Sequence, residues 1–357
     1  MLEYLEKLIS FYPVSDDQVA VKRLLDYVAD FLKSKGFIVE LIEHEGINSL
    51  YASVSGSKHS RLLLEGHIDV VPGADQPFLV DGDTVKGRGT YDMLFGTAAF
   101  MRLIDELTNP IADYDIAVML TGDEEHGGLN GVKRLLQDDG YTTDICIMPD
   151  AGQGFGSMNI AAKGVYQPTI RINGRSHHGS RPWEGDSAST KLVQFLTEFA
   201  KAFNTSDQAN STMTIAGLQA GEAANQGPAT AQTGLDIRYS DKADLARIEI
   251  TLANLLKQYD GIIIDTHRGD DFQLDMQNPD VLQFIKVYER YVGKPINFTK
   301  AHGSSDARFF NEKGMPVIML RPDGGGAHGD EEWLSIASYD AFYAVLKEYV
   351  IDIAGKR

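Results

Sequence analysis

The sequence has little cysteine, little positive charge and no long apolar segment. One cysteine among 357 residues excludes an internal disulfide and a metal site built from several thiolates. No apolar run approaches the roughly 20 residues that a membrane-spanning helix needs. The first residues, MLEYLEKLISFYPVSDD, place acids inside the apolar stretch and lack the basic start of a signal peptide. We therefore expect a cytoplasmic protein that has no membrane partner.

The charge balance argues against a nucleic-acid partner. Against 51 acidic residues stand 33 Lys and Arg, which gives a formal net charge of −18. Such a chain repels phosphate backbones, although acidity is also a simple route to solubility. A hydrophobic fraction of 43% is enough for sizeable cores, and the length suits two domains or one domain with an insertion.

The two ends of the chain read as one α/β domain. Ser15 or Asp16 is placed to cap the first predicted helix, which Gly36 ends. Apolar runs and helical patterns then alternate, as expected for a mostly parallel sheet. The predicted strands are 37–42, 61–64, 116–120 and 145–148, and the predicted helices are about 94–108 and 129–137. After residue 275 the α/β pattern returns. It has helices at 280–292, near 306–312 and from about 338, and a strand at 317–320.

The middle of the chain has a different pattern. A strand at 165–172 is followed by a helix at about 187–203, strands at 212–218 and 230–239, a helix at 242–258 and a strand at 261–268. This β-α-β-β-α-β order is typical of a ferredoxin-like α+β sandwich. The sequence thus predicts an α/β domain formed by 1–163 and 275–357, interrupted by an inserted domain at 164–274.

A histidine follows the apolar run at 61–64. It belongs to the segment Gly66-His67-Ile68-Asp69, and ligands bind beyond the carboxyl ends of strands in such sheets. His67 can bind a metal, and Asp69, two residues on, points to the same side and can hold the other imidazole nitrogen. Alone, this segment fits a capped strand end equally well.

Four further segments place metal-binding side chains at turns or after predicted strands. They contribute Asp92 in 87–93, Glu124 and Glu125 in 121–128, Asp150 in 147–152, and His328 in 324–332. Each alone fits a solvated turn, and His126 in the second segment is expected to be exposed. Together with His67 they supply two imidazoles and several carboxylates at one sheet edge, a ligand set that suits Zn²⁺ or Mn²⁺. Of two adjacent glutamates, one can bind metal while the other acts as general base.

Two other segments remain ambiguous on residues alone. His177 and His178 lie in a glycine-containing stretch of the insertion and are exposed loop residues by default. Arg308 can clamp a carboxylate with two parallel hydrogen bonds, or it can form an ion pair on a helix surface. The single Cys146 lies between two isoleucines and is expected to be a buried strand residue.

The order and spacing of the five segments resemble the dizinc amidohydrolase and peptidase family of acetylornithine deacetylase, succinyl-diaminopimelate desuccinylase, aminoacylase, carboxypeptidase G and bacterial tripeptidase. The likeness runs from Ser10-Phe11-Tyr12-Pro13 to His328-Gly329-Asp330-Glu331-Glu332. It implies a zinc-peptidase-like catalytic α/β domain with a central mixed, mostly parallel sheet. The inserted domain would be a lid through which two chains form a homodimer.

The resemblance also implies a role for individual residues. Two divalent metal ions per subunit are expected, zinc foremost, with manganese or cobalt as alternatives. The implied metal ligands are His67, Asp92, Glu125, Asp150 and His328, with Asp92 shared by both ions. Glu124 would be the general base, and Asp69 would orient His67. His178, with His177 as its rival, would stabilise the oxyanion. Asn225 and Arg308 would contact the substrate, and the peptide bond after Asp92 is expected to be cis.

These features predict a metal-dependent hydrolase of an amide bond in an N-acyl-amino acid or a short peptide with a free carboxylate. Deacylase, aminopeptidase or di- or tripeptidase, and carboxypeptidase activities remain open. Asp150 stands where deacylases of the family often have Glu, which weakens a direct deacylase assignment. A catalytically inactive, metal-stabilised binding homologue is the alternative from another class.

Overall fold

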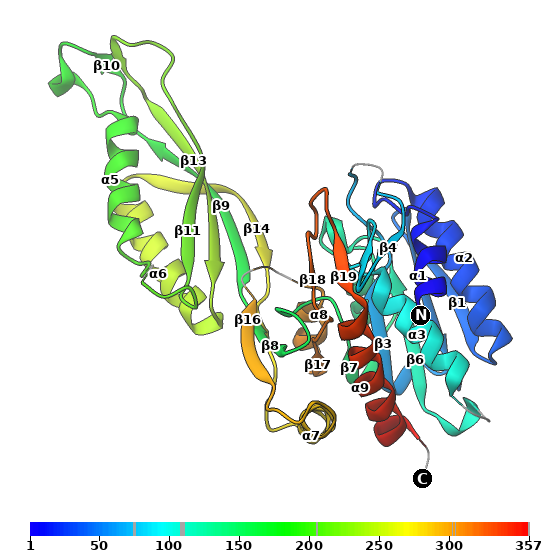
Figure 1. The fold of residues 1–357 in the computed structure, drawn as a ribbon. Coiled ribbons are helices and arrows are strands. Elements are labelled where there is room, and N and C mark those ends of the chain that lie inside the picture. Colours follow the sequence, from blue (N-terminus) through cyan, green and yellow to red (C-terminus); the bar gives the residue numbers. More distant parts are fainter. Residues whose placement is uncertain (74–75, 108–110, 205, 302, 304, 356–357) are drawn as a thin grey trace. The chain divides into compact units, whose positions relative to one another are not determined.

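The computed structural model describes residues 1–73, 76–107, 111–204, 206–301, 303 and 305–355. These divide into two compact units. Unit 1 comprises Met1–Ile160, Gln273–Thr299 and Ser305–Arg357, and unit 2 comprises Ala161–Phe272 and Lys300–Ser304. Each unit has its own sheet (Figure 1).

Unit 1 is built around a mixed sheet with the strand order β1-β2-β6-β3-β7-β17. The strands are β1 (Ile38–His44), β2 (Ile47–Ser53), β6 (Ile116–Thr121), β3 (His59–His67), β7 (Thr142–Ile147) and β17 (Val317–Ile318). Only β2 runs against the others in this sheet, because it pairs antiparallel with both β1 and β6 while the remaining pairs are parallel. The predicted mixed, mostly parallel sheet is confirmed.

Helices cover this sheet. The helices are α1 (Leu2–Ile9), α2 (Gln18–Ser34), α3 (Leu94–Glu106), α4 (Val132–Gln137), α7 (Pro279–Val292), α8 (Ala307–Glu312) and α9 (Ile336–Ala354). Helix α2 lies against β1 and β2, whereas α3 and α9 lie against β3 (Figure 1). Strand β6 is buried along its whole length, as expected for an inner strand covered on both faces. Cys146 on β7 is fully buried, as predicted.

The cap of α2 differs from the prediction. Asp17, rather than Ser15 or Asp16, accepts a hydrogen bond from the backbone N–H of Ala20. Ser15 instead donates its hydroxyl to the carboxylate of Asp69. Ser15, which the sequence pattern predicts to be a helix cap, therefore binds the carboxylate of Asp69 just after β3.

Two small sheets are absent from the predictions. One has the order β18-β19-β5-β4, formed by β18 (Gly324–Gly325), β19 (Trp333–Ser335), β5 (Thr84–Lys86) and β4 (Leu79–Asp81). The other, β15-β8-β16, consists of β15 (Phe272–Gln273), β8 (Ser157–Ala162) and β16 (Asn297–Ala301). The first brings residues near 86 beside residues near 333, which are about 250 positions apart in sequence.

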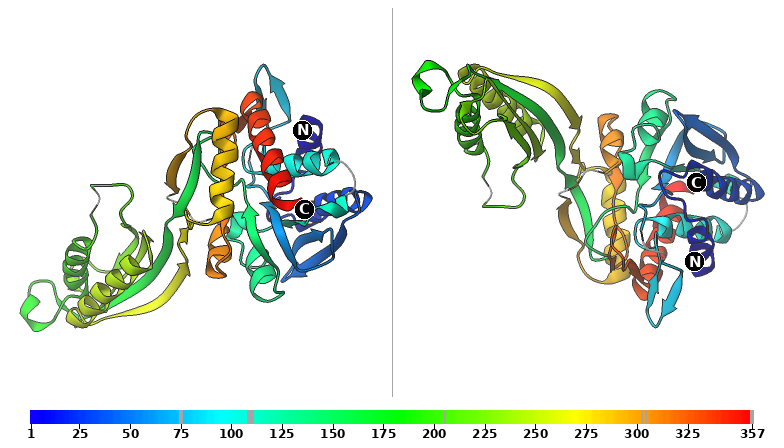
Figure 2. Two further views of the ribbon diagram at one scale, coloured as in Figure 1. Left: turned by 90° about the horizontal axis from the view of Figure 1, so that it is seen from below. Right: turned by 90° about the horizontal axis from the view of Figure 1, so that it is seen from above.

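Unit 2 has the predicted β-α-β-β-α-β order. Its main elements are β9 (Gly164–Asn173), α5 (Ala188–Ala200), β11 (Thr212–Ala220), β13 (Thr230–Tyr239), α6 (Lys242–Gln258) and β14 (Gly261–Gly269). The antiparallel sheet has the order β11-β13-β9-β14, the arrangement of a ferredoxin-like sandwich. One apolar core joins this sheet to α5 and α6, which lie side by side on the same face (Figure 2). A short antiparallel strand pair, formed by β10 (His177–His178) and β12 (Gln226–Gly227), also belongs to this unit.

A carboxylate at the end of α3 ties that helix to α9. Glu106 accepts hydrogen bonds from Arg102, Tyr343 and Lys347 at 2.7–2.8 Å. Burial raises the pKa of Glu106, but the bonds from Lys347, Tyr343 and Arg102 outweigh burial and lower the pKa to about 2. The charged form is therefore favoured in the folded state.

We expect Glu106→Gln to lower the free energy of unfolding at pH 7 by about 1 kcal/mol, because the site is partly exposed. The folded-state pKa lies below the ordinary glutamate value of 4.5, so the contribution is full above that pH and disappears as the pH falls toward 2. Urea unfolding of both proteins at pH 7, 4.5 and 3.5 should show a shrinking difference. Asp340→Asn, an exposed change on α9, is the control. A difference that does not depend on pH would contradict the assignment.

Candidate metal centre

The carboxyl ends of parallel strands bring the predicted site residues together. In the register of the sheet, His67 at the end of β3 pairs with Thr121 at the end of β6, and Leu64 pairs with Ile147 at the end of β7. The chain continues from these ends into the turns that carry Glu124, Glu125 and Asp150. Sheet pairing thus accounts for the convergence of segments that lie far apart in sequence.

Asp92 lies between two imidazoles. Its Oδ1 atom is 3.3 Å from Nε2 of His67, and its Oδ2 atom is 3.2 Å from Nε2 of His328. Asp92 lies directly before Met93, the N-cap residue of α3, and the peptide bond between the two is cis, as predicted. Each carboxylate oxygen therefore faces a different ring, which is the arrangement that a bridging ligand requires.

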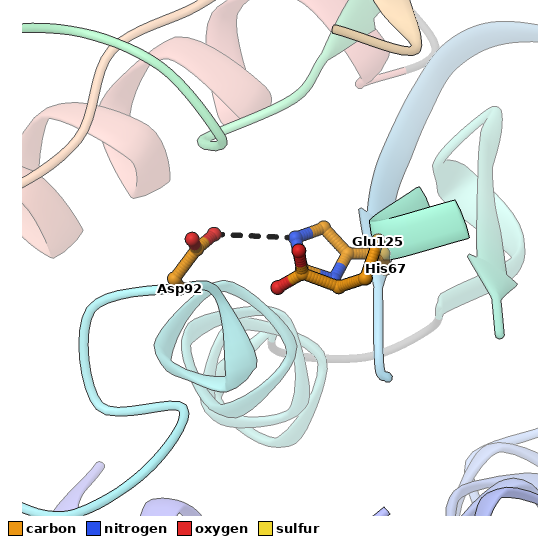
Figure 3. Close-up of side chains that lie close together, drawn as sticks. All are labelled: His67, Asp92 and Glu125. Atoms are coloured by element: carbon orange, nitrogen blue, oxygen red, sulfur yellow. Dashed lines mark hydrogen bonds and ion pairs between the residues drawn. The ribbon is translucent and has the colours of Figure 1, made fainter. Parts of the chain in front are cut away.

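Two more carboxylates complete the cluster, one beside each imidazole. Oε2 of Glu125 is 2.9 Å from Nε2 of His328, whereas Oδ1 of Asp150 is 3.7 Å from Nε2 of His67. His67, Asp92 and Glu125 each offer a ligand atom within 4.8 Å of the others. Figure 3 shows these three side chains pointing toward one another. The structure thus forms two ligand groups that share Asp92.

The Asp69 side chain supports the glutamate turn more directly than it supports His67. The backbone carbonyl of Asp69 lies 2.9 Å from Nδ1 of His67, and its carboxylate is farther away, at 3.6 Å. That carboxylate accepts hydrogen bonds from Ser15 and from the backbone N–H groups of Glu124 and Glu125. Asp69 therefore fixes one nitrogen of His67 through its main chain and the start of the glutamate turn through its side chain.

Acidic side chains crowd together around His67. Burial, followed by the nearby Asp150, raises the pKa of Glu124 well above its usual value. Burial also raises the pKa of Glu125 to about 7. Burial lowers the pKa of His67, but the carboxylates of Asp150, Asp69 and Asp92 outweigh it and raise that pKa well above the ordinary value. Burial therefore disfavours the charged forms of the two glutamates, while the neighbouring carboxylates favour the charged form of His67.

The donor set fits divalent metal ions. Imidazole nitrogens and carboxylate oxygens are ligands of Zn²⁺, Mn²⁺ and Co²⁺. Among the described residues, Oε1 of Glu125 is a buried oxygen that has no hydrogen-bond partner. A cation between the two ligand groups would satisfy this oxygen and relieve the repulsion.

Arg308 lies in a buried position near the glutamate turn. It is 7% exposed, and its guanidinium donates to the backbone carbonyls of Ser305 at 3.1 Å and Gly127 at 2.5 Å. The alternative of a helix-surface ion pair is therefore excluded by its burial. His126 is exposed, as expected.

His178 and Asn225 belong to unit 2. His178 pairs with Gln226 in the antiparallel β10–β12 strand pair, and the N–H of Gly179 donates to the carbonyl of Asn225. His178 is exposed and accepts a hydrogen bond at Nδ1 from the N–H of Ser180. The β10–β12 pair thus brings the segments of the two predicted residues together.

Sequence reasoning missed several charged residues around the cluster. Glu65 is fully buried on β3 two residues before His67, and burial raises its pKa well above the usual value. Burial raises the pKa of Asp306 to about 7. Arg321 donates to the carbonyl of Gly152 at 3.0 Å. Glu65 interrupts an apolar run and Arg321 follows one, which are signals that sequence alone could have supplied.

Comparison with known proteins gives one consistent family. A sequence model described as "Peptidase family M20/M25/M40" matches residues 63–352. The succinyl-diaminopimelate desuccinylase of Sulfurovum sp. is 26% identical over 98% of this chain and 98% of its own length. That of Methylobacterium sp. is 28% identical over 90% of this chain and 89% of its own.

Solved structures share the fold at lower sequence identity. Aminopeptidase PepT from Bacillus cereus superposes with a TM-score of 0.81 at 17% identity, covering 99% of this chain and 97% of that one. A tripeptidase from Staphylococcus aureus gives a TM-score of 0.79 at 19% identity, with coverage of 99% and 97%. A metallo-carboxypeptidase from Sulfolobus solfataricus gives 0.73 at 16%, covering 98% of each chain.

We expect metal binding to stabilise unit 1. Adding Zn²⁺, Mn²⁺ or Co²⁺ to chelator-treated protein should raise the free energy of unfolding by about 2.7 kcal/mol when free metal is a hundredfold above Kd. His67→Asn should lose most of this gain, whereas His126→Asn, which changes an exposed histidine one residue beyond Glu125, should retain it. Thermal unfolding with and without metal measures the effect. Equal gains in both variants would contradict the site.

Proposed function

We propose that this chain, which belongs to peptidase family M20/M25/M40, is a dinuclear enzyme that hydrolyses an amide bond in a small N-acyl-amino acid or peptide. Membership makes it a metal-dependent hydrolase. The observation that carries the dinuclear proposal is Asp92, whose two oxygens face His67 and His328. His67 and Asp150 would hold one ion, His328 and Glu125 the other, and zinc would be the native metal, with manganese or cobalt as alternatives.

Glu124 is the proposed general base. When bound, the metal ions lower the pKa of a water molecule and polarise the substrate carbonyl. Glu124 takes a proton as the water oxygen attacks the carbonyl carbon, and it gives that proton to the leaving nitrogen as the C–N bond breaks. Its backbone N–H donates to Asp69, which holds the turn that carries Glu124 beside the cluster, and its carboxylate form is the one that accepts a proton.

His178, rather than His177, is the proposed oxyanion donor. Because Nδ1 of His178 accepts the N–H of Ser180, the neutral ring carries its proton on Nε2 and can donate it. His177 instead contacts the carbonyl of His178 through Nδ1, and its ring lies against the backbone of Gly227. Asn225, directly before β12, would contact substrate.

The free carboxylate of the substrate is assigned to Arg308. A guanidinium has five N–H donors in a planar fork, which matches a carboxylate. Its bond to Gly127 places this cation directly after the glutamate turn. A cation at this position also suits a site whose own residues are mainly acidic.

Unit 2 is the proposed lid and dimerisation domain, with boundaries near residues 164 and 274. Strand β14 is an edge strand of its sheet and exposes Ile262, Ile263 and Ile264, each by at least 40%. Exposed apolar edge strands are ready to pair with another chain. In a homodimer, the lid of one subunit would bring its His178 to the site of the other. Light scattering tests this, since a monomer would remove the cross-subunit role.

The substrate class is to be decided by a mixed panel. Full-length sequence relatives are desuccinylases, which favours an N-acyl-amino acid, whereas the described structural relatives include a tripeptidase and a carboxypeptidase. Turnover of N-acetyl- and N-succinyl-amino acids, dipeptides and tripeptides, measured with metal content, separates these activities. No turnover of any member would favour the inactive binding homologue, which the complete ligand set and Glu124 argue against.

Glu124→Gln should retain both metal ions while kcat falls by about 10²–10⁴-fold, because the variant cannot accept a proton. Metal analysis and turnover on the best panel substrate measure the two effects. Glu184→Gln, an exposed change in unit 2, should alter neither. Near-wild-type turnover in Glu124→Gln would remove Glu124 from its role.

His178→Ala should reduce kcat by about 10²–10³-fold and leave the metal content unchanged, since the ring acts only on the developing oxyanion. His177→Ala should have a smaller effect on kcat, arising from the β10–β12 strand pair that His177 supports. If His178→Ala loses metal, His178 is a ligand. If His177→Ala is the more damaging change to kcat at full metal content, the assignment of the two histidines is reversed.

A further inference from the structure

A buried carboxylate outside the proposed ligand set holds the loop that carries Asp92. Glu332 is fully buried, directly before β19. Its Oε1 atom accepts the backbone N–H groups of Tyr91 at 2.8 Å and Asp92 at 2.9 Å. Its Oε2 atom accepts the N–H of Gly89 at 3.0 Å and Nη1 of Arg88 at 2.8 Å. Four donors converge on one carboxylate.

The loop needs this external support. Gly87 and Gly89 have positive φ values of 144° and 86°, so the chain between β5 and α3 follows no regular element. Within the loop, Thr90 donates its N–H and its hydroxyl to the carbonyl of Gly87. The N–H groups of Gly89, Tyr91 and Asp92 are instead satisfied by Glu332, because buried N–H groups need acceptors.

Arg88 connects the same carboxylate to the loop of His328. The Arg88 side chain is 2% exposed, and its Nη2 donates to the carbonyl of Gly329 at 2.7 Å. The N–H of Gly87 donates to the carbonyl of Glu332, and Lys86 pairs with Trp333 in the small sheet. The segment before Asp92 and the segment after His328 are thus fastened to each other over a few residues.

We propose that Glu332, acting with Arg88, is a positioning residue that sets the separation between Asp92 and His328 and thereby the affinity of the metal position formed by Asp92, Glu125 and His328. This inference rests on the proposed dinuclear function. Glu332 touches backbone N–H groups rather than the proposed ligand atoms. The pair adds no net charge to an acidic site, because Arg88 neutralises Glu332.

A purely stabilising ion pair is a weaker interpretation. Buried ion pairs often contribute little net stability compared with apolar replacements. Here three of the four bonds to Glu332 come from the backbone of the ligand-bearing loop, and one of them comes from Asp92 itself. Residues that orient ligands in this way commonly change metal affinity by about 10–100-fold when replaced.

Glu332→Gln is the direct test. The amide keeps the shape, but its NH₂ group faces two donors whichever way it is turned, so two of the four hydrogen bonds are lost. Isothermal titration of chelator-treated protein with Zn²⁺ should show one site at wild-type affinity and a second site weakened by about 10–100-fold. At limiting Zn²⁺ kcat should fall, with recovery at excess Zn²⁺ and little change in KM. Glu331→Gln, an exposed neighbour, should match the wild type.

Several results would overturn the proposal. Wild-type affinity at both sites in Glu332→Gln would do so, as would an equal loss at both sites accompanied by a lower Tm, which marks a general structural role. Should that variant fail to fold, Arg88→Lys is measured in the same way. It retains the charge beside Glu332 but cannot also reach Gly329, so we expect the second site alone to weaken several-fold, and unchanged affinity would refute the proposal.

The same titration separates this inference from the proposed function. A wild-type protein that binds only one Zn²⁺ ion, or none, contradicts the dinuclear centre itself. A wild-type protein that binds two ions, with Glu332→Gln indistinguishable from it, leaves the dinuclear centre standing and rejects only the role of Glu332.

Discussion

The position of one carboxylate, that of Asp92 between two imidazoles, is the constraint on which the site depends. His67 lies at the end of β3, and His328 lies in the loop between β18 and β19. Asp92 must meet both rings at similar distances, 3.3 and 3.2 Å. Sheet pairing places His67 accurately, but neither Asp92 nor His328 lies on a strand of the main sheet. Their relative position is fixed by the small sheet and by Glu332.

Electrostatics links this geometry to the energetics of the whole unit. Carboxylates that sit close together in a buried site disfavour each other's charged forms. Arg88 does little to relieve this repulsion, because its charge is already engaged by Glu332. The site is therefore costly to build without metal, and folding and metal binding stabilise each other.

The main sheet and the convergence of the ligand residues could be predicted from sequence, because both follow from local patterns. Apolar runs mark the strands. Ligand residues at or shortly after the carboxyl ends of β3 and β6 lie at the same edge of the sheet, because these strands are parallel. The ferredoxin-like order of unit 2 could be predicted for the same reason, because local patterns mark its strands and helices. Strand β2 was missed, although the Glu45-Gly46 turn before it, with φ values of 51° and 82°, is a hairpin signal.

The role of the supporting residues could not be predicted, because it depends on contacts between distant segments. Glu332 is the third of three successive acids, and nothing in the sequence separates it from its exposed neighbour Glu331. The sequence around Arg308 was compatible with a clamp for a substrate carboxylate or with an ion pair on a helix surface. Its hydrogen bonds to backbone carbonyls depend on the fold. Ser15 resembles a helix cap until the carboxylate of Asp69 is placed beside it.

The small sheet that pairs β5 with β19 also determines when the site can exist during synthesis. Four of the proposed ligands lie within the first 150 residues, and they can gather as soon as β3, β6 and β7 have paired. His328 and Glu332 leave the ribosome only after the whole of unit 2 has been made. Until then the Asp92 loop lacks its acceptors, so a nascent chain can hold an incomplete cluster of acids but cannot form the bridged centre. For this chain, completion of the site therefore has to wait for the synthesis of unit 2.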